Sequence, residues 1–142
     1  MRIREVLRSK GDTVFTISPD ATVTDLLNEL SRHNVGALVV SADGSRAVGI
    51  VSERDVVRRL QDRGVGVLEE PVSTIMTTTV NTCTEDDDVE GLMRMMTHHR
   101  IRHVPVLRDS TLVGVISIGD VVKNRIGELE YERSNLIGYI AG

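Results

Sequence analysis

Two serine–aspartate pairs have the residue types and the spacing either to bind a ligand or to start a helix. Ser52 lies three residues before Asp55, and Ser117 lies three residues before Asp120. Each pair follows a glycine and two aliphatic residues. A serine followed at this spacing by an acid is a capping box, in which both side chains bind backbone N–H groups at a helix start. The pairs therefore predict two strands that each turn into a capped helix.

The same side chains also suit an anion and a diol. A helix N-terminus offers free N–H groups and a partial positive charge to a phosphate, which the serine hydroxyl can also reach. The carboxylate can accept from two vicinal hydroxyls, as acidic residues do for ribose in dinucleotide folds. Helix capping alone would explain one occurrence. A second occurrence at the matching place of a repeat favours a ligand site.

The two pairs occupy matching positions in a sequence unit that occurs twice. An apolar helix face reappears 66 residues later in the chain, as Val23, Leu26, Leu27 and Leu30 against Val89, Leu92, Met93 and Met96. At the serine–aspartate motif the offset falls to 65, which indicates a one-residue difference in the turn at 41–46 against 108–111.

The residue pattern of each copy predicts an extended segment, an amphipathic helix, two strands joined by a turn, and a second helix. In the first copy these are residues 14–17, 22–33, 37–40, 47–51 and 53–61, and in the second 80–83, 88–99, 103–107, 112–116 and 118 onward. A unit of this size is marginally stable alone, so the sheets should pack together. The sequence predicts an α+β fold of two β-α-β-β-α repeats arranged as a pseudo-two-fold pair.

The predicted domain boundaries divide the chain into four segments. Residues 1–62 are the first repeat with an N-terminal segment, 63–74 a connector rich in Gly and Pro, 75–124 the second repeat, and 125–142 a C-terminal helical extension. Six residues of this extension lie mostly on one helical face, namely Ile126, Leu129, Arg133, Leu136, Ile137 and Ile140. This face either contacts another copy of the chain or packs back onto its own domain.

Composition argues against several classes of function. Apolar residues make up 40% of the 142 residues and charged residues 27%, as in ordinary globular proteins. The net charge of −4 and an aromatic content of 2% disfavour nucleic acid as a partner. We find no leader and no apolar run of membrane-spanning length, so we expect a cytoplasmic protein without membrane contact. The single cysteine, Cys83, fits a reducing compartment and a core position.

The sequence lacks the residue sets of common enzymes and metal sites. We find no activated nucleophile and no phosphate-binding loop ending in Lys-Ser or Lys-Thr, so no enzyme is predicted. His99 and His103 are four residues apart, but the helix should end near His99, and no metal is expected. Arg102 and His103 begin a strand near the motif and are candidate phosphate partners. Alternatively, the basic cluster at 98–103 is a solvated helix end whose cations complement the dipole.

The ordered set of motifs resembles a pair of CBS domains (the cystathionine β-synthase domain, or Bateman module), of the small stand-alone bacterial type. The resemblance covers residues 12–124 and rests on Ser18–Val23, Val35–Val40, Gly49–Asp55, Ile75–Thr77, Arg100–Val106 and Gly114–Asp120. Each motif is weak by itself, whereas the two-fold set in this order is specific.

The resemblance implies that adenosine compounds bind in two clefts between the repeats: AMP, ADP, ATP, NAD(H) or S-adenosylmethionine. In this family the aspartate holds the ribose, and the serine lies near ribose and phosphate. Carried over, one cleft uses Ser117, Asp120, Val115, Arg102 and His103 with Lys10, Phe15, Val35, Gly36 and Ala37. The other uses Ser52, Asp55 and Ile50 with Met76, Thr77, Asn81, Ile101, Arg102 and His103. Because Gly36 and Ala37 replace Arg102 and His103, the Asp120 cleft should hold phosphate better.

The predicted function is a regulatory, energy- or redox-sensing module that binds AMP, ADP, ATP or NAD(H) and forms a homodimer. The alternative is a protein-interaction module that regulates a separate effector protein, with nucleotide binding secondary.

Overall fold

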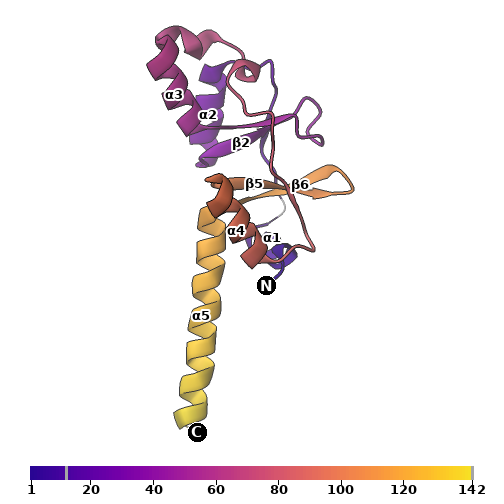
Figure 1. Cartoon of the computed structure of the whole chain (residues 1–142), viewed down its shortest axis with the longest axis vertical. Coiled ribbons are helices and arrows are strands. Elements are labelled where there is room, and N and C mark those ends of the chain that lie inside the picture. Colours follow the sequence, from indigo (N-terminus) through magenta and orange to yellow (C-terminus); the bar gives the residue numbers. More distant parts are fainter. Residues whose placement is uncertain (12, 142) are drawn as a thin grey trace.

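The computed structural model of the chain describes residues 1–11 and 13–141. Two three-stranded sheets lie in the middle of the molecule, one above the other (Figure 1). Helices α2 and α3 lie on the outer side of the first sheet, and α1, α4 and the start of α5 lie on the outer side of the second (Figure 1). This arrangement confirms the predicted α+β pair of repeats packed through their sheets.

Both repeats have the predicted β-α-β-β-α order. The first comprises β1 (Thr16–Ile17), α2 (Val23–His33), β2 (Ala37–Val40), β3 (Gly49–Ser52) and α3 (Glu53–Arg63). The second comprises β4 (Cys83–Thr84), α4 (Val89–His99), β5 (His103–Arg108), β6 (Thr111–Ser117) and α5 (Ile118–Ala141). In each sheet the middle strand runs parallel to the first and antiparallel to the third.

The one-residue offset between the copies falls in the hairpin, as predicted. Val40 pairs with Gly49 in the first sheet, and Val106 pairs with Gly114 in the second. Residues 41–48 separate the first pair, and residues 107–113, one fewer, separate the second. The second hairpin also contains a register shift between Val106 and Leu107, where Val113 is the extra residue on β6.

Each hydrophobic core is completed by a segment that lies outside its own repeat. Helix α1 (Ile3–Lys10) places Ile3, Val6 and Leu7 in the core of the second repeat. The connector forms two short 3-10 helices, η1 (Val65–Glu69) and η2 (Val72–Thr74), and contributes Val67 and Val72 to the core of the first repeat. Residues 1–10, which the sequence analysis groups with the first repeat, therefore pack with the second.

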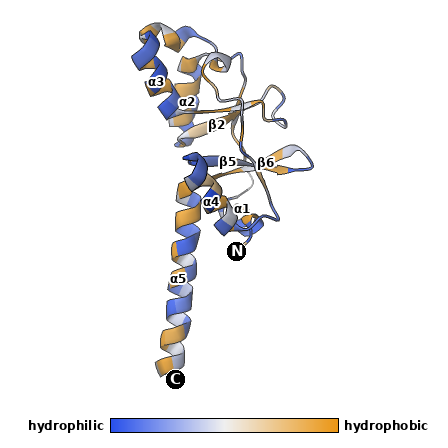
Figure 2. Ribbon diagram, viewed as in Figure 1, coloured by the Kyte–Doolittle hydropathy of each residue, from blue (hydrophilic) through white to orange (hydrophobic). Residues whose placement is uncertain are grey.

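Helix α5 extends well beyond the rest of the molecule (Figure 1). Every residue from 129 to 140 is exposed, so the apolar face does not pack back onto its own domain. Apolar and polar residues alternate along the free part of the helix (Figure 2). No helix in the described part of the chain is long and apolar enough to cross a membrane.

Candidate functional site

Both serine–aspartate pairs form the predicted capping boxes. The Ser52 N–H donates to Asp55 Oδ2 at 2.8 Å, and the Asp55 N–H donates to Ser52 Oγ at 3.3 Å. The second copy repeats this geometry, with 2.9 Å from the Ser117 N–H to Asp120 Oδ2 and 3.1 Å for the return bond. The capping bonds use only one oxygen of each carboxylate. Among the described residues, Oδ1 of Asp55 and of Asp120 accepts no hydrogen bond, so it remains available to a ligand hydroxyl.

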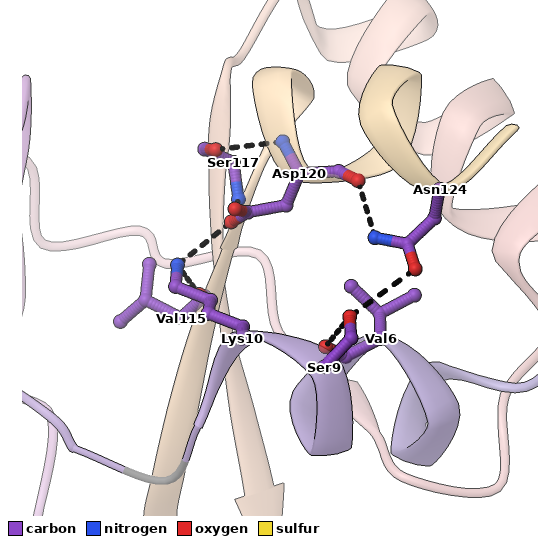
Figure 3. Close-up of polar contacts among 7 residues, drawn as sticks. All are labelled: Val6, Ser9, Lys10, Val115, Ser117, Asp120 and Asn124. Carbon is purple, nitrogen blue, oxygen red and sulfur yellow. Dashed lines mark hydrogen bonds and ion pairs between the residues drawn. The ribbon is translucent and has the colours of Figure 1, made fainter. Parts of the chain in front are cut away.

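Lys10, at the end of α1, pairs directly with Asp120. Its ammonium group lies 2.7 Å from Asp120 Oδ2 and 2.5 Å from the carbonyl oxygen of Val115 (Figure 3). Burial by itself would raise the pKa of Asp120. The hydrogen bonds from Lys10 and Ser117 together outweigh this effect, so the pKa lies below its usual range. The resemblance grouped Lys10 with Asp120, but it did not predict that the two side chains would form an ion pair.

A second set of bonds ties the end of α1 to the first turns of α5. The Ser9 hydroxyl lies 3.0 Å from the Val6 carbonyl oxygen and 3.3 Å from Asn124 Oδ1. The Asn124 side-chain amide donates to the carbonyl oxygen of Asp120 at 2.7 Å (Figure 3). The residues around Asp120 therefore connect the N-terminal helix to the C-terminal one.

The starts of β2 and β5 lie close together where the two repeats meet. A Cβ atom added to Gly36 would lie 3.4 Å from His103 Cε1 and 3.5 Å from Glu53 Oε1. Burial lowers the pKa of His103, as do the charges of Lys10 and Arg102, against opposing effects of Asp120 and Glu53. The net shift of the His103 pKa is downward, which favours the neutral imidazole. Gly36 is therefore the small residue that gives this imidazole its place between the repeats.

The Asp55 side opens onto a cavity of about 630 Å³, a size typical of small-molecule sites. Its lining includes Asp55, Val57, Arg58, Arg59, Gln61, Asp62, Ile75, Met76 and Thr77. Thr77 forms a two-bond backbone bridge with Ile50, at 2.9 and 3.0 Å, which places Met76 and Thr77 beside the start of β3. A side chain on Gly49 would clash here, because an added Cβ would lie 2.7 Å from Met76 Sδ.

Arg58 and Arg59 are lining residues that the sequence analysis did not single out. They lie three and four residues after Asp55, so helical spacing puts them on its face of α3. Arg59 contacts Asp62 at 3.5 Å. This spacing is the signal by which the two arginines could have been found.

The remaining predicted residues are spread over both sides of the pair. Phe15 stacks on His33 with ring centroids 3.6 Å apart. Val35 and Ile101 precede β2 and β5 and pack against the first and second cores. Ala37 is buried in β2, and Arg102 is exposed while its carbonyl oxygen accepts from the Ile118 N–H at 2.8 Å. Asn81 lies half-buried in the loop before β4.

Within the described residues, no three His, Cys, Asp or Glu side chains cluster as metal ligands.

Two β-α-β-β-α repeats packed through their sheets, each with a serine–aspartate pair at the junction of its last strand and helix, define a tandem-repeat α+β module. The chain belongs to the CBS domain family, whose profile matches residues 3–62 and 72–127.

Known relatives agree with this membership. The chain is 37% identical to the mitochondrial CBS domain-containing protein CBSX3 of Arabidopsis thaliana, over 99% of this chain and 72% of the relative. Its fold is similar to that of the CBS-domain protein ATU1752 from Agrobacterium tumefaciens, with a TM-score of 0.85, 40% identity and coverage of 88% and 99% of the two chains. The CBS domain protein PAE2072 from Pyrobaculum aerophilum, complexed with AMP, has a TM-score of 0.74 and 32% identity, over 84% of this chain and 89% of that one.

Proposed function

We propose that this chain is a regulatory module that binds adenine nucleotides in clefts between its repeats and acts as a homodimer. AMP, ADP, ATP and NAD(H) share the adenosine group that such a cleft would recognise. The observation that carries the proposal is the uncommitted Oδ1 of Asp55 and of Asp120, each beside a serine hydroxyl at a helix start. The AMP complex of the related protein PAE2072 supports this ligand class.

The arrangement divides the recognition of a nucleotide among three kinds of group. The free carboxylate oxygen would accept from the ribose hydroxyls, as in other nucleotide folds. Cationic side chains near each aspartate, Lys10 at one site and Arg58 at the other, would pair with phosphate. The adenine would pack on aliphatic side chains and backbone, because aromatic residues make up only 2% of the chain.

Calorimetry with AMP, ATP and NADH tests the proposal, using Asp55→Asn and Asp120→Asn. Each substitution keeps the shape of the cap but removes the charge, and each should weaken binding at its own cleft by tenfold or more. Asp25→Asn is the matched control, because Asp25 forms the same capping box with Thr22 at the start of α2. Unchanged nucleotide affinity in both Asp55→Asn and Asp120→Asn would contradict the assignment of the two binding sites. An equal loss of affinity in Asp25→Asn would contradict it as well.

If the chain binds nucleotides for regulation only, it should not convert them. Incubation of the pure protein with AMP, ATP or NADH and Mg²⁺ should leave each nucleotide intact. The mass of a compound released from the purified protein on denaturation would identify the ligand that it binds in the cell.

A further inference from the structure

Helix α5 carries apolar residues at the spacing of a coiled-coil seam. Steps of four and three residues alternate through Val122, Ile126, Leu129, Arg133, Leu136 and Ile140. At about 100° per residue, these six side chains fall within an arc of about 80°. The five apolar members are 47% to 75% exposed, although residues of these types are usually buried.

The seam points away from the domain that carries it. Val121 is buried and Asn124 and Glu128 are half-buried, which identifies the side of α5 that faces its own repeat. This side lies about 100° or more around the helix from the centre of the seam. No rearrangement within the chain is needed for the seam to meet a partner.

We infer that the seam from Val122 to Leu136 is covered by the same face of α5 in a second copy, in an antiparallel two-stranded coiled coil. This specifies the surface of the homodimer proposed above and does not depend on nucleotide binding. In the register that we assign, Ile126 lies opposite Leu129 of the second copy and Leu129 lies opposite its Ile126. Leu136 then meets Gly119 of the second copy, where the missing side chain leaves room.

The flanking charges favour this register. Lys123 would face Glu130 of the second copy, and Arg125 would face its Glu132, each pair occurring twice by symmetry. In the free chain Arg125 pairs with Glu128 on its own helix at 2.9 Å, and it can reach either partner. Shifting the antiparallel register by one heptad would instead place Glu130 and Glu132 opposite their own copies, which is repulsive.

The position of Arg133 argues against the parallel arrangement. In a parallel pair, each seam residue meets its own copy, so two arginines would lie side by side in the interior. In the antiparallel register Arg133 lies opposite Val122 of the second copy, and the two guanidinium groups are far apart. A single charged residue in a seam is a known determinant of orientation and register.

Light scattering and sedimentation of the full chain test the surface. Leu129→Glu should raise the dimer dissociation constant by at least 100-fold. Tyr131→Glu, on the opposite face and 69% exposed, is the matched control and should leave the dimer intact. A wild-type chain that stays monomeric at high concentration, or a dimer that survives Leu129→Glu, would overturn the inference.

Charge exchange provides a second test with solvent-exposed residues, so it stays informative if the seam variant fails to fold. Glu130→Lys with Glu132→Lys should weaken the dimer about tenfold or more, and adding Lys123→Glu and Arg125→Glu should restore it. Failure of the second pair to restore association contradicts the assigned contacts.

Disulfide formation in a mixture of Ile126→Cys and Leu129→Cys chains tests the relative orientation of the two helices. The antiparallel register predicts the mixed disulfide, whereas a parallel pair predicts the two homodisulfides. Calorimetry on the same seam variants separates the two proposals. If a monomeric seam variant still binds nucleotide normally, the result supports the cleft assignment independently of the dimer. If the chain dimerises normally but binds no nucleotide, the result supports the seam and contradicts the clefts.

Discussion

The Lys10 ammonium group lies 2.7 Å from Asp120 Oδ2, although 110 residues separate the two in the chain. Asp55, the matching carboxylate of the first repeat, forms no ion pair among the described residues and instead lines an open cavity. The two copies of the motif therefore differ in the charge that faces the carboxylate. Under the proposed function, a ligand at Asp120 would have to share or displace the Lys10 cation, whereas a ligand at Asp55 would not.

Replacing Lys10 should change the ionisation of Asp120. Lys10→Met keeps most of the aliphatic stem but removes the charge, so the pKa of Asp120 should rise. The pair is partly exposed, with 34% and 22% of the two side chains accessible, so we expect a loss of about 0.5–1 kcal/mol in the unfolding free energy at pH 7. Carbon-detected NMR titration of the carboxyl group and chemical denaturation measure the two effects.

The pH dependence of this difference has a definite sign. The pKa of Asp120 is depressed in the folded protein, so its stabilising contribution is complete above the ordinary value of about 3.9. The contribution is lost as the pH falls through the folded-state pKa, and the wild type and Lys10→Met should converge there. Arg8→Met, on the same helix, is the control. An unchanged Asp120 titration in Lys10→Met would contradict the contact.

Because α1 packs on the second repeat, Gly114 should not tolerate replacement by a larger residue. A Cβ atom on Gly114 would lie 2.5 Å from Leu7 Cδ2, and Leu7 is buried. Gly114→Ala should therefore cost about 1–3 kcal/mol of unfolding free energy through overpacking. Combined with Leu7→Ala, which makes room, its cost should largely disappear in a double-mutant cycle. Gly127→Ala, with open space around the position, should be neutral or slightly stabilising. Additive costs would show that α1 packs elsewhere.

Short-range patterns explain why the elements of both repeats were predictable. The helix predicted at 22–33 is observed at Val23–His33, because the Thr22–Asp25 capping box and the apolar face are local signals. The strand predicted at 14–17 is reduced to Thr16–Ile17, since only these two residues pair with the parallel strand β2. The extent of a strand depends on its partner, which periodicity does not reveal.

The contacts that distinguish the Asp120 site from the Asp55 site are long-range, and only the resemblance, not a local pattern, grouped Lys10 with Asp120. The first ten residues read as a mixture of charged and aliphatic residues, and nothing local assigns them to the second repeat. Their place depends on the space above Gly114, which only the packed sheet defines. The pairing of Lys10 with Asp120 and the opening of the Asp55 cavity follow from that placement.

The single thiol should be unreactive in the folded protein. Burial, with a smaller effect from the charge of Asp87, raises the pKa of Cys83 to about 12. Almost no thiolate is present at pH 8, and the side chain is also inaccessible. Maleimide labelling should therefore be at least 100-fold slower than in denaturant, and mass spectrometry measures both rates. Rapid labelling of the native chain would show that the core around β4 opens readily.

The arginines of the Asp55 cavity should discriminate nucleotides from nucleosides. Arg58→Met removes a cation from the lining of the cavity while keeping its aliphatic bulk. We expect the affinity for AMP to fall by about tenfold or more, since a hydrogen bond to a charged group contributes about 1.5–3 kcal/mol, and adenosine affinity to stay unchanged. Arg59→Met should have a smaller effect, because Arg59 also contacts Asp62 at 3.5 Å.

Calorimetry in an Asp120→Asn background isolates this cleft, and Arg54→Met, on the same helix but outside the lining, is the matched control. The effect of Arg58→Met should shrink as salt is raised, because screening weakens a partly exposed cation–phosphate contact. Equal losses for AMP and adenosine would mean that Arg58 shapes the ribose or base site and does not contact phosphate. Equal losses in Arg54→Met would mean that the net charge of α3, and not the position of Arg58, determines the affinity.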